Sequence, residues 1–267
     1  MLTLPSRPGP AVRPLHHRQI VSGDTAAGMI RAGNTVAVGW LGDSVASALQ
    51  AAFQERRQPR DLTLVYGATK GNGRTHGLNI LAEEGLVRRV IGGQWHPVPG
   101  LHAMALSDRI EAYSLPVGII NRLFREIAAG VSGHLSRSGI GTFTDPRNGG
   151  GRLNRSTREE MVQLVHAAGE EALLFSTFPI DVALIGMAFV EGTGEIAMTR
   201  DAMAIARAAR KSGGVVIAQT DRVGTLYRLP PGQIVAPDTM VDALVVDNAR
   251  DPAAERFASA PVGRTRA

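Results

Sequence analysis

Short apolar runs alternate with amphipathic stretches along most of the chain. The spacing predicts buried strands at residues 35–38, 62–66, 87–91, 110–113, 181–185 and 215–219, with a last apolar run at 241–246. It predicts helices at 43–57, 78–84, 99–106, 117–129 and 201–211. Elements alternating in this way favour right-handed crossovers. The predicted fold class is α/β, a mostly parallel open sheet flanked by helices.

The first strand runs straight into a glycine turn. Residues 39–42 read Gly-Trp-Leu-Gly, and either Asp43 or Ser44 is expected to cap the helix that follows. A helix N-terminus offers unpaired N–H groups and the positive end of a dipole. Gly39 and Gly42 are therefore candidates for holding an anionic or carbonyl group. Upstream, Ser22 or Asp24 is expected to cap a short helix that ends at Gly33.

Two further strands break at once into glycine or proline. Gly92, Gly93 and Gln94 follow the strand at 87–91, and Pro116-Val117-Gly118 follows the strand at 110–113. Open α/β sheets bind ligands at the carboxyl ends of their strands, so both breaks are candidate site positions, and Gly93 and Val117 are expected to line a common hollow there. Taken singly, each glycine is also what an ordinary turn requires.

The middle of the chain is rich in glycine. Residues 130–154 are too long for a simple connector, and loops of that size are often functional or lie at an interface. Asp145 is expected to hold a turn, and Arg147 to reach a carboxylate or a partner chain. Residues 157–166 have helical spacing, but a β-hairpin turning at Gly169-Glu170 and returning at 172–175 is preferred. A turn is predicted at 191–195.

Composition and charge exclude several classes of protein. No cysteine is present, which excludes disulfides, thiolate catalysis and cysteine zinc sites. The net charge of +5 is scattered, without the basic, aromatic-interleaved stripe that a nucleic-acid-binding protein would show.

The ends of the chain differ from its middle. Residues 1–19 are predicted to be a flexible arm and residues 248–267 a flexible tail, which leaves 20–247 as the folded domain. The longest apolar run, 182–190, is about half of what a bilayer requires, and the first residues lack a signal peptide's apolar region. A soluble cytoplasmic protein without a membrane partner is expected.

Common catalytic motifs are missing. Gly67, Gly71, Gly73 and Gly77 lack the spacing and the lysine of a phosphate loop. His96 follows the Gly92-Gly93 pair, but the seven histidines form no zinc motif and no serine elbow accompanies them. A lone loop histidine is more often structural, and no metal site is predicted.

A set of collinear segments carries a resemblance. VIGGQW, EAYSLPVG, LFREIAAG, GTFTDPR and GGRLN occur in this order, preceded by GNTVAVG, PRDLTLVYGATKGNG and HGLNILAEEGLVRRVIGG and followed by FPIDVALI and KSGGVVIAQ. Together they resemble the first half, or α subunit, of acetate and 3-oxoacid coenzyme A transferases of family I. The resemblance covers roughly residues 20–247.

The resemblance implies an activity and a partner. Such enzymes move coenzyme A from an acyl-CoA to a carboxylic acid, with 3-oxo acids among the candidates, through a glutamate nucleophile in the second half of the fold. No catalytic residue is therefore expected on this chain, and the glutamate is expected on a β subunit. A heterodimer or α2β2 assembly is implied. Coenzyme A esters are substrates, and no permanently bound cofactor is expected.

Two departures from the family fall at the expected substrate site. Val117 stands where the family has a glutamine whose amide stabilises an oxyanion, and Trp40 stands where it has a second glycine. Gln94 is a candidate replacement amide. These departures keep two alternatives open: an acyl-CoA hydrolase or carbon–carbon lyase subunit on the same scaffold, and a catalytically silent acyl-CoA-binding subunit.

Overall fold

The protein is built on one seven-stranded parallel sheet. The computed structural model describes residues 20–68, 76–189, 196–220 and 232–246. The sheet order is β13 (Ala243–Val246), β11 (Val215–Thr220), β8 (Val182–Gly186), β1 (Thr35–Val38), β2 (Leu62–Tyr66), β3 (Val87–Gly92) and β4 (Glu111–Ser114). Every neighbouring pair is parallel. The predicted α/β class is confirmed.

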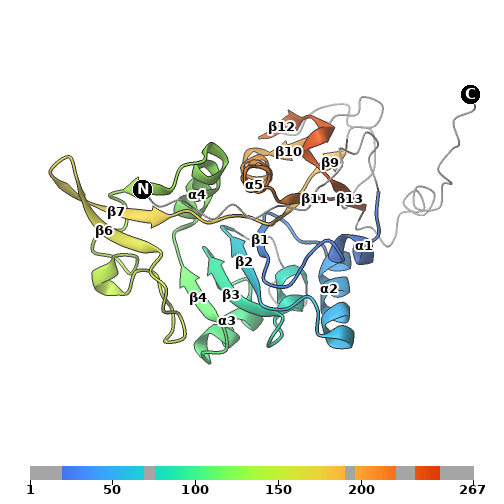
Figure 1. The fold of residues 1–267 in the computed structure, drawn as a ribbon, viewed down its shortest axis with the longest axis horizontal. Helices are drawn as coiled ribbons and strands as arrows, with labels where there is room; N and C mark the ends of the chain where they lie inside the picture. The colour runs from blue at the N-terminus through green and yellow to red at the C-terminus, as the bar shows by residue number, and fades with distance from the viewer. Residues whose placement is uncertain (1–19, 69–75, 190–195, 221–231, 247–267) are drawn as a thin grey trace, which may run out of the picture.

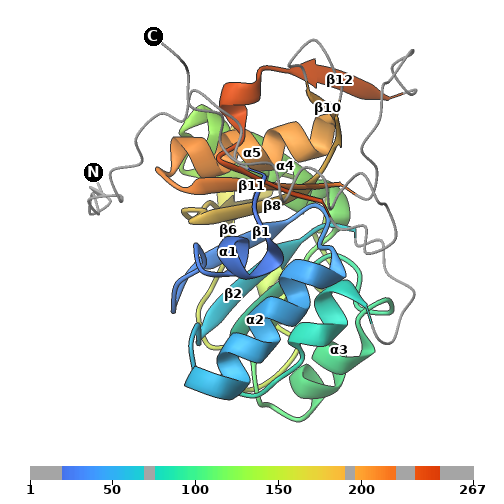
Figure 2. The ribbon, with the colours of Figure 1, turned by 90° about the vertical axis from the view of Figure 1, so that its right-hand side faces the viewer.

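Helices cover both faces of this sheet (Figure 2). α1 (Gly23–Ala27), α2 (Asp43–Arg56) and α3 (Pro99–Leu106) lie on one face, and α4 (Val117–Ala129) and α5 (Arg200–Lys211) on the other. Successive residues of each strand pack on opposite faces of the sheet. Leu64 belongs to the core under α2, and Val65 belongs to the core under α4. Burial on both faces explains why these strands appear in the sequence as continuous apolar runs.

One predicted helix end and one predicted cap are wrong. Ser22 caps α1 by accepting a hydrogen bond from Thr25 N (3.2 Å), but the helix stops at Ala27, because tight turns follow it and Gly33 lies in a separate turn. α2 is capped by the backbone of Gly42, since the Asp43 side chain binds elsewhere.

The helix predicted at 78–84 is instead a short 3-10 turn, η1 (Gly77–Leu81). Its Asn79 side chain bonds Pro97 O (3.0 Å) and Gly100 N (3.4 Å). An asparagine side chain that hydrogen-bonds to backbone groups of another segment in this way does not favour continuation of the helix.

A three-stranded antiparallel arm extends away from the main sheet (Figure 1). Its strands are β5 (Gly133–Ser136), β7 (Glu170–Ser176) and β6 (Val162–Ala167), so the predicted hairpin is confirmed and the helical alternative is wrong. The turn lies one residue earlier than predicted. Ala168 (φ 51°) and Gly169 (φ 83°) form it, and two positive φ values are what a tight two-residue hairpin requires.

A second small sheet, which the sequence did not predict, joins β9 (Ala188–Phe189), β10 (Ile196–Thr199) and β12 (Gln233–Ala236). A further 3-10 turn, η3 (Asp238–Met240), precedes β13. Within the described residues, no helix combines the length and the apolar character needed to cross a bilayer. The predicted flexible ends, 1–19 and 248–267, and the predicted turn at 191–195 lie outside the described residues.

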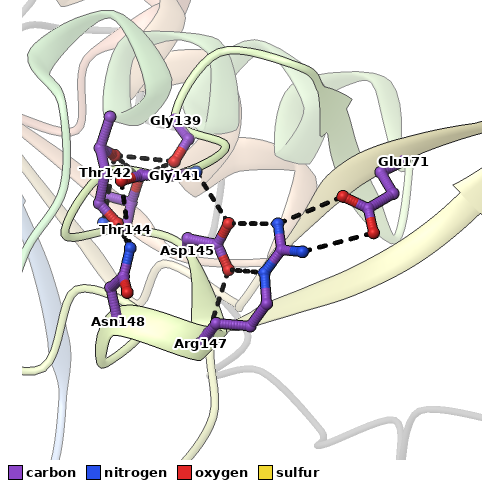
Figure 3. Close-up of polar contacts among 8 residues, drawn as sticks. All are labelled: Gly139, Gly141, Thr142, Thr144, Asp145, Arg147, Asn148 and Glu171. Atoms are coloured by element: carbon purple, nitrogen blue, oxygen red, sulfur yellow. Dashed lines mark hydrogen bonds and ion pairs between the residues drawn. The ribbon is translucent and has the colours of Figure 1, made fainter.

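The glycine-rich passage is organised by one buried carboxylate (Figure 3). Asp145 begins the 3-10 turn η2 (Pro146–Asn148) and accepts hydrogen bonds from Gly141 N (2.8 Å) and from Arg147 N (3.0 Å). The Arg147 guanidinium adds two more, from Nε (3.0 Å) and Nη2 (2.7 Å). Arg147 also contacts Glu171 on β7, so the turn predicted for Asp145 ties the passage to the arm.

These contacts fix the charge state of the pair. The hydrogen bond from Arg147, followed by the one from Gly141 N, holds the pKa of Asp145 well below its usual range. The same hydrogen bond raises the pKa of Arg147. The Arg147 guanidinium is already paired with two carboxylates. Arg147 therefore has a structural role and is not a free anion-binding site.

Replacing Asp145 by asparagine is expected to lower the midpoint of thermal unfolding by several degrees at neutral pH, since the replacement loses the charge-assisted bonds. A depressed carboxyl pKa stabilises the fold above the unfolded value of about 3.9 and loses that effect as the pH falls through the folded value. Thermal melts at a series of pH values should therefore show the deficit of Asp145→Asn shrinking below about pH 4. Asp61→Asn, at an exposed carboxylate 3.6 Å from Arg60, is the matched control. An equal deficit in both variants would contradict this role.

Candidate functional site

The sheet has one topological switch point, at β1. Strands β2, β3 and β4 follow on one side of β1, and β8, β11 and β13 lie on the other. Where the direction of winding reverses, the connecting segments diverge and leave a crevice at the carboxyl ends of the strands. The glycine segments at 39–42 and 92–93 and the start of α4 all lie along this edge.

Gly93, Gly67 and Val117 meet at the ends of β2 and β3. Gly93 N donates to Tyr66 O (2.9 Å). A β-carbon at position 93 would collide with the Gly67 carbonyl oxygen and lie 2.9 Å from Val117 Cγ2. Only glycine fits this approach, so the backbone itself forms the surface here. The predicted proximity of Gly93 and Val117 is present.

Helix α4 points its first residues at the same place. Pro116 is the N-cap and supplies no side-chain hydrogen bond, and Val117 and Gly118 open the helix. The first N–H groups of a helix have no intrahelical partner. Gly118 has open space where a side chain would be. Val117 itself offers no side-chain donor, so the polarity of this corner comes from the backbone.

Asn121 brings a side-chain amide to that corner. Its Oδ1 would lie 2.8 Å from a β-carbon at Gly67, and its Nδ2 donates to Asp201 Oδ2 (3.4 Å) on α5. Asn121 is one turn after Val117 on α4, on the face towards β2. The sequence prediction missed it, although the four-residue spacing was a usable signal.

The 39–42 loop lies on the other side of the end of β2. Gly39 N (2.8 Å) and Trp40 N (3.3 Å) both donate to Leu184 O on β8. A β-carbon at Gly39 would lie 3.1 Å from Ile205 Cδ1 of α5, so glycine lets the helix approach the loop. Gly42 N donates to Gln219 Oε1 (3.0 Å), a contact that sequence reasoning missed.

A carboxylate and an imidazole stand at the start of α2. Asp43 Oδ1 accepts from Gly77 N (2.8 Å), and Asp43 Oδ2 contacts His76 Nδ1. Both side chains are half exposed. His76 was not predicted as a site residue, because nothing in its local sequence shows that it faces Asp43.

The remaining predicted positions are spread around this edge. Gly92 ends β3 with its Cα against Tyr66 and Trp95, while Gln94 and His96 are exposed. Tyr66 is fully buried; burial raises the pKa of its phenol, and Oη has no partner among the described residues. Gln94 is thus open to solvent.

The described residues contain no cluster of three or more histidine, aspartate or glutamate side chains placed to hold a metal ion. Among the described residues, the polar groups named along the edge are backbone amides, the carboxamides of Asn121, Gln219 and Gln94, and the Asp43–His76 pair. Such a set can orient and polarise a carbonyl oxygen.

A sequence model described as Coenzyme A transferase matches residues 22–247. The chain therefore belongs to the coenzyme A transferase family. It is 33% identical over 238 residues to the caffeate CoA-transferase of Acetobacterium woodii, covering 85% of this chain and 45% of that protein. It is 26% identical over 222 residues to the acetate CoA-transferase subunit alpha of Escherichia coli K12, covering 83% of this chain and 93% of that subunit.

Solved structures agree with this assignment. The acyl-CoA transferase YdiF of Escherichia coli O157:H7, as apoenzyme, superimposes with a TM-score of 0.78 at 29% identity, covering 88% of this chain and 48% of that one. A YdiF thioester complex with CoA gives 0.76 at 30% identity, covering 85% and 46%. The chain thus spans about half the length of the caffeate CoA-transferase and of YdiF, and most of the length of the alpha subunit.

The close approach at the strand ends makes a direct prediction about two glycines. Gly93→Ala should destabilise the fold by about 1–3 kcal/mol, because the added methyl group meets backbone and cannot be accommodated by a side-chain rotation. Gly118→Ala, in open space within a helix, should be neutral or stabilising by up to about 1 kcal/mol. Urea unfolding of both variants measures the difference. Equal stabilities would show that the two strand ends can separate without cost.

Proposed function

We propose that this chain is the α-type half of a coenzyme A transferase and that it acts with a β-type half. The observation that carries the proposal is the family match across residues 22–247, and the similarity to 93% of the acetate CoA-transferase subunit alpha of Escherichia coli K12 supports the α-type assignment. The substrates are a coenzyme A ester and a carboxylic acid, 3-oxo acids included. A heterodimer or α2β2 assembly is the expected form.

The proposed reaction is covalent. A glutamate carboxylate of the β-type half attacks the thioester carbonyl, the carbon–sulfur bond breaks, and coenzyme A leaves as the thiolate. The thiolate then attacks the glutamate carbonyl of the mixed anhydride, releasing the first acid and leaving a glutamyl–CoA thioester. The acceptor carboxylate reverses both steps and leaves as the new thioester. No proton is gained or lost over the cycle.

This chain would stabilise the oxyanion that forms at each attack. The N–H groups of Val117 and Gly118 open α4 at the carboxyl edge, where the helix dipole adds a positive potential. Removing one side-chain donor from such a site costs roughly 10²- to 10³-fold in rate. Because Val117 lacks that donor, backbone amides and a neighbouring carboxamide such as Asn121 or Gln94 must supply the stabilisation.

The arm and the glycine-rich passage supply a surface for the other half. Phe143 (54% exposed) and Leu135 (47%) are large apolar side chains left open to solvent, and Val131 and Leu153 add to them. Large exposed apolar residues concentrated in one segment are typical of association sites. The length of the passage supports the same interpretation.

One observation favours a second candidate. Val117 and Trp40, the two departures from the family pattern, both flank the candidate site, while the scaffold is retained. A hydrolase or a carbon–carbon lyase subunit on this scaffold would need a different arrangement there. In a hydrolase, the partner would activate water instead of attacking covalently. A silent acyl-CoA-binding subunit is the remaining alternative.

Trapping separates these candidates. The complex of this chain with its β-type half, incubated with an acyl-CoA and then borohydride, should give a reduced glutamate in the partner that mass spectrometry detects. The partner with that glutamate changed to glutamine is the control and should show no modification. Release of free coenzyme A without an acceptor acid would point to the hydrolase. The absence of any turnover would leave the binding subunit, and either outcome would contradict the transferase proposal.

A further inference from the structure

Gln219 lies at the carboxyl end of β11, two strands away from β1, and its side chain is fully buried (0% exposed). Both ends of its amide are used by one loop. Oε1 accepts from Gly42 N (3.0 Å), and Nε2 donates to Trp40 O (3.0 Å). A buried carboxamide bonded on both sides by the same three-residue segment holds that segment in one conformation.

The intervening strand leaves a path for this contact. Gly186 of β8 is the residue paired with Gln219 in the sheet, and it has no side chain. A β-carbon at Gly186 would lie 3.1 Å from Trp40 Cβ. The glycine therefore lets Trp40 pack on β8 while Gln219 reaches over that strand. Met187 N donates to Gln219 O (2.9 Å) and fixes the backbone from which the amide extends.

The loop leads directly into helix α2. Gly42 is the N-cap of α2, and the helix begins at Asp43 beside His76. Gly42 N is buried and Trp40 O is partly buried, and such polar groups are costly to leave unpaired. If the Gln219 carboxamide is removed, these two backbone groups must form hydrogen bonds with water instead. The loop must then move to expose them to solvent.

We propose that Gln219 is a positioning residue: it clamps the Trp40–Gly42 loop at the switch point and so sets the start of α2 against the acyl-CoA site. The clamp itself does not depend on the enzyme's reaction. Only its role beside a thioester rests on the proposed function.

Glutamate at position 219 provides a reversible test. A protonated glutamic acid has the shape of glutamine, with a carbonyl oxygen that accepts from Gly42 N and an O–H that donates to Trp40 O. A glutamate anion cannot donate, and it would repel the Trp40 carbonyl. Burial raises the pKa of a carboxyl group, so the switch between these forms should fall near or above neutral pH.

Trp40 reports on the loop directly. The chain has two tryptophans, so Trp95→Phe leaves Trp40 as the single tryptophan, which is excited selectively over the three tyrosines at the long-wavelength edge of absorption. In that background, acrylamide quenching of Gln219→Glu should rise about twofold at roughly pH 8.5 and return to the parent value at roughly pH 5.5. Gln219→Met, which is apolar at both pH values, should be more quenched than the parent at each.

Two controls make the result specific. The parent run at both pH values accounts for any effect of pH on the loop that does not come from residue 219. Gln163→Glu, at an exposed position on β6, adds the same charge away from the loop and should match the parent. Quenching of Gln219→Glu that equals the parent at high pH, or that stays high at low pH, would overturn the clamp. Because this readout needs no turnover, it can succeed even if the transferase proposal fails.

Discussion

The carboxyl edge of the sheet depends on the close contact of two strand ends. Gly93 lies so near the Gly67 carbonyl that no side chain fits between them, and Val117 packs against both. This contact fixes the position of the segments that follow β3 and β4. It therefore also fixes the position of the start of α4. A larger residue would separate the two strand ends and displace the N–H groups of α4. The candidate site is therefore a property of backbone packing more than of individual side chains.

A second fixed point lies across the end of β2. There, Leu184 O and Gln219 hold the loop that follows β1, and Gly39 lets Ile205 of α5 approach. The two fixed points are supported by different helices, α4 and α5, which lie on the same face of the sheet (Figure 2). Because both helices pack on the same face, the two loops keep a fixed position relative to each other. A site that orients one carbonyl oxygen requires such a fixed arrangement.

The sequence could predict the strands and helices because burial on both faces leaves unbroken apolar runs, as at residues 182–185. It could also predict that Gly93 and Val117 come together, since parallel strands deliver their ends to one edge. It could not predict Gln219 or the Asp43–His76 pair. Each of these depends on side chains from distant segments, and no local pattern marks such contacts. The cap of α2 was missed for the same reason, because Asp43 is engaged by Gly77.

The central claim is that a thioester binds at the carboxyl edge, next to the start of α4. A crystal structure of the assembled complex with a non-hydrolysable acyl-CoA analogue tests it most directly. The account predicts that the carbonyl oxygen lies within hydrogen-bonding distance of the Val117 or Gly118 N–H, with Gly93 beneath it. An analogue bound with its carbonyl away from these groups, for example along the arm at β6 and β7, would contradict it.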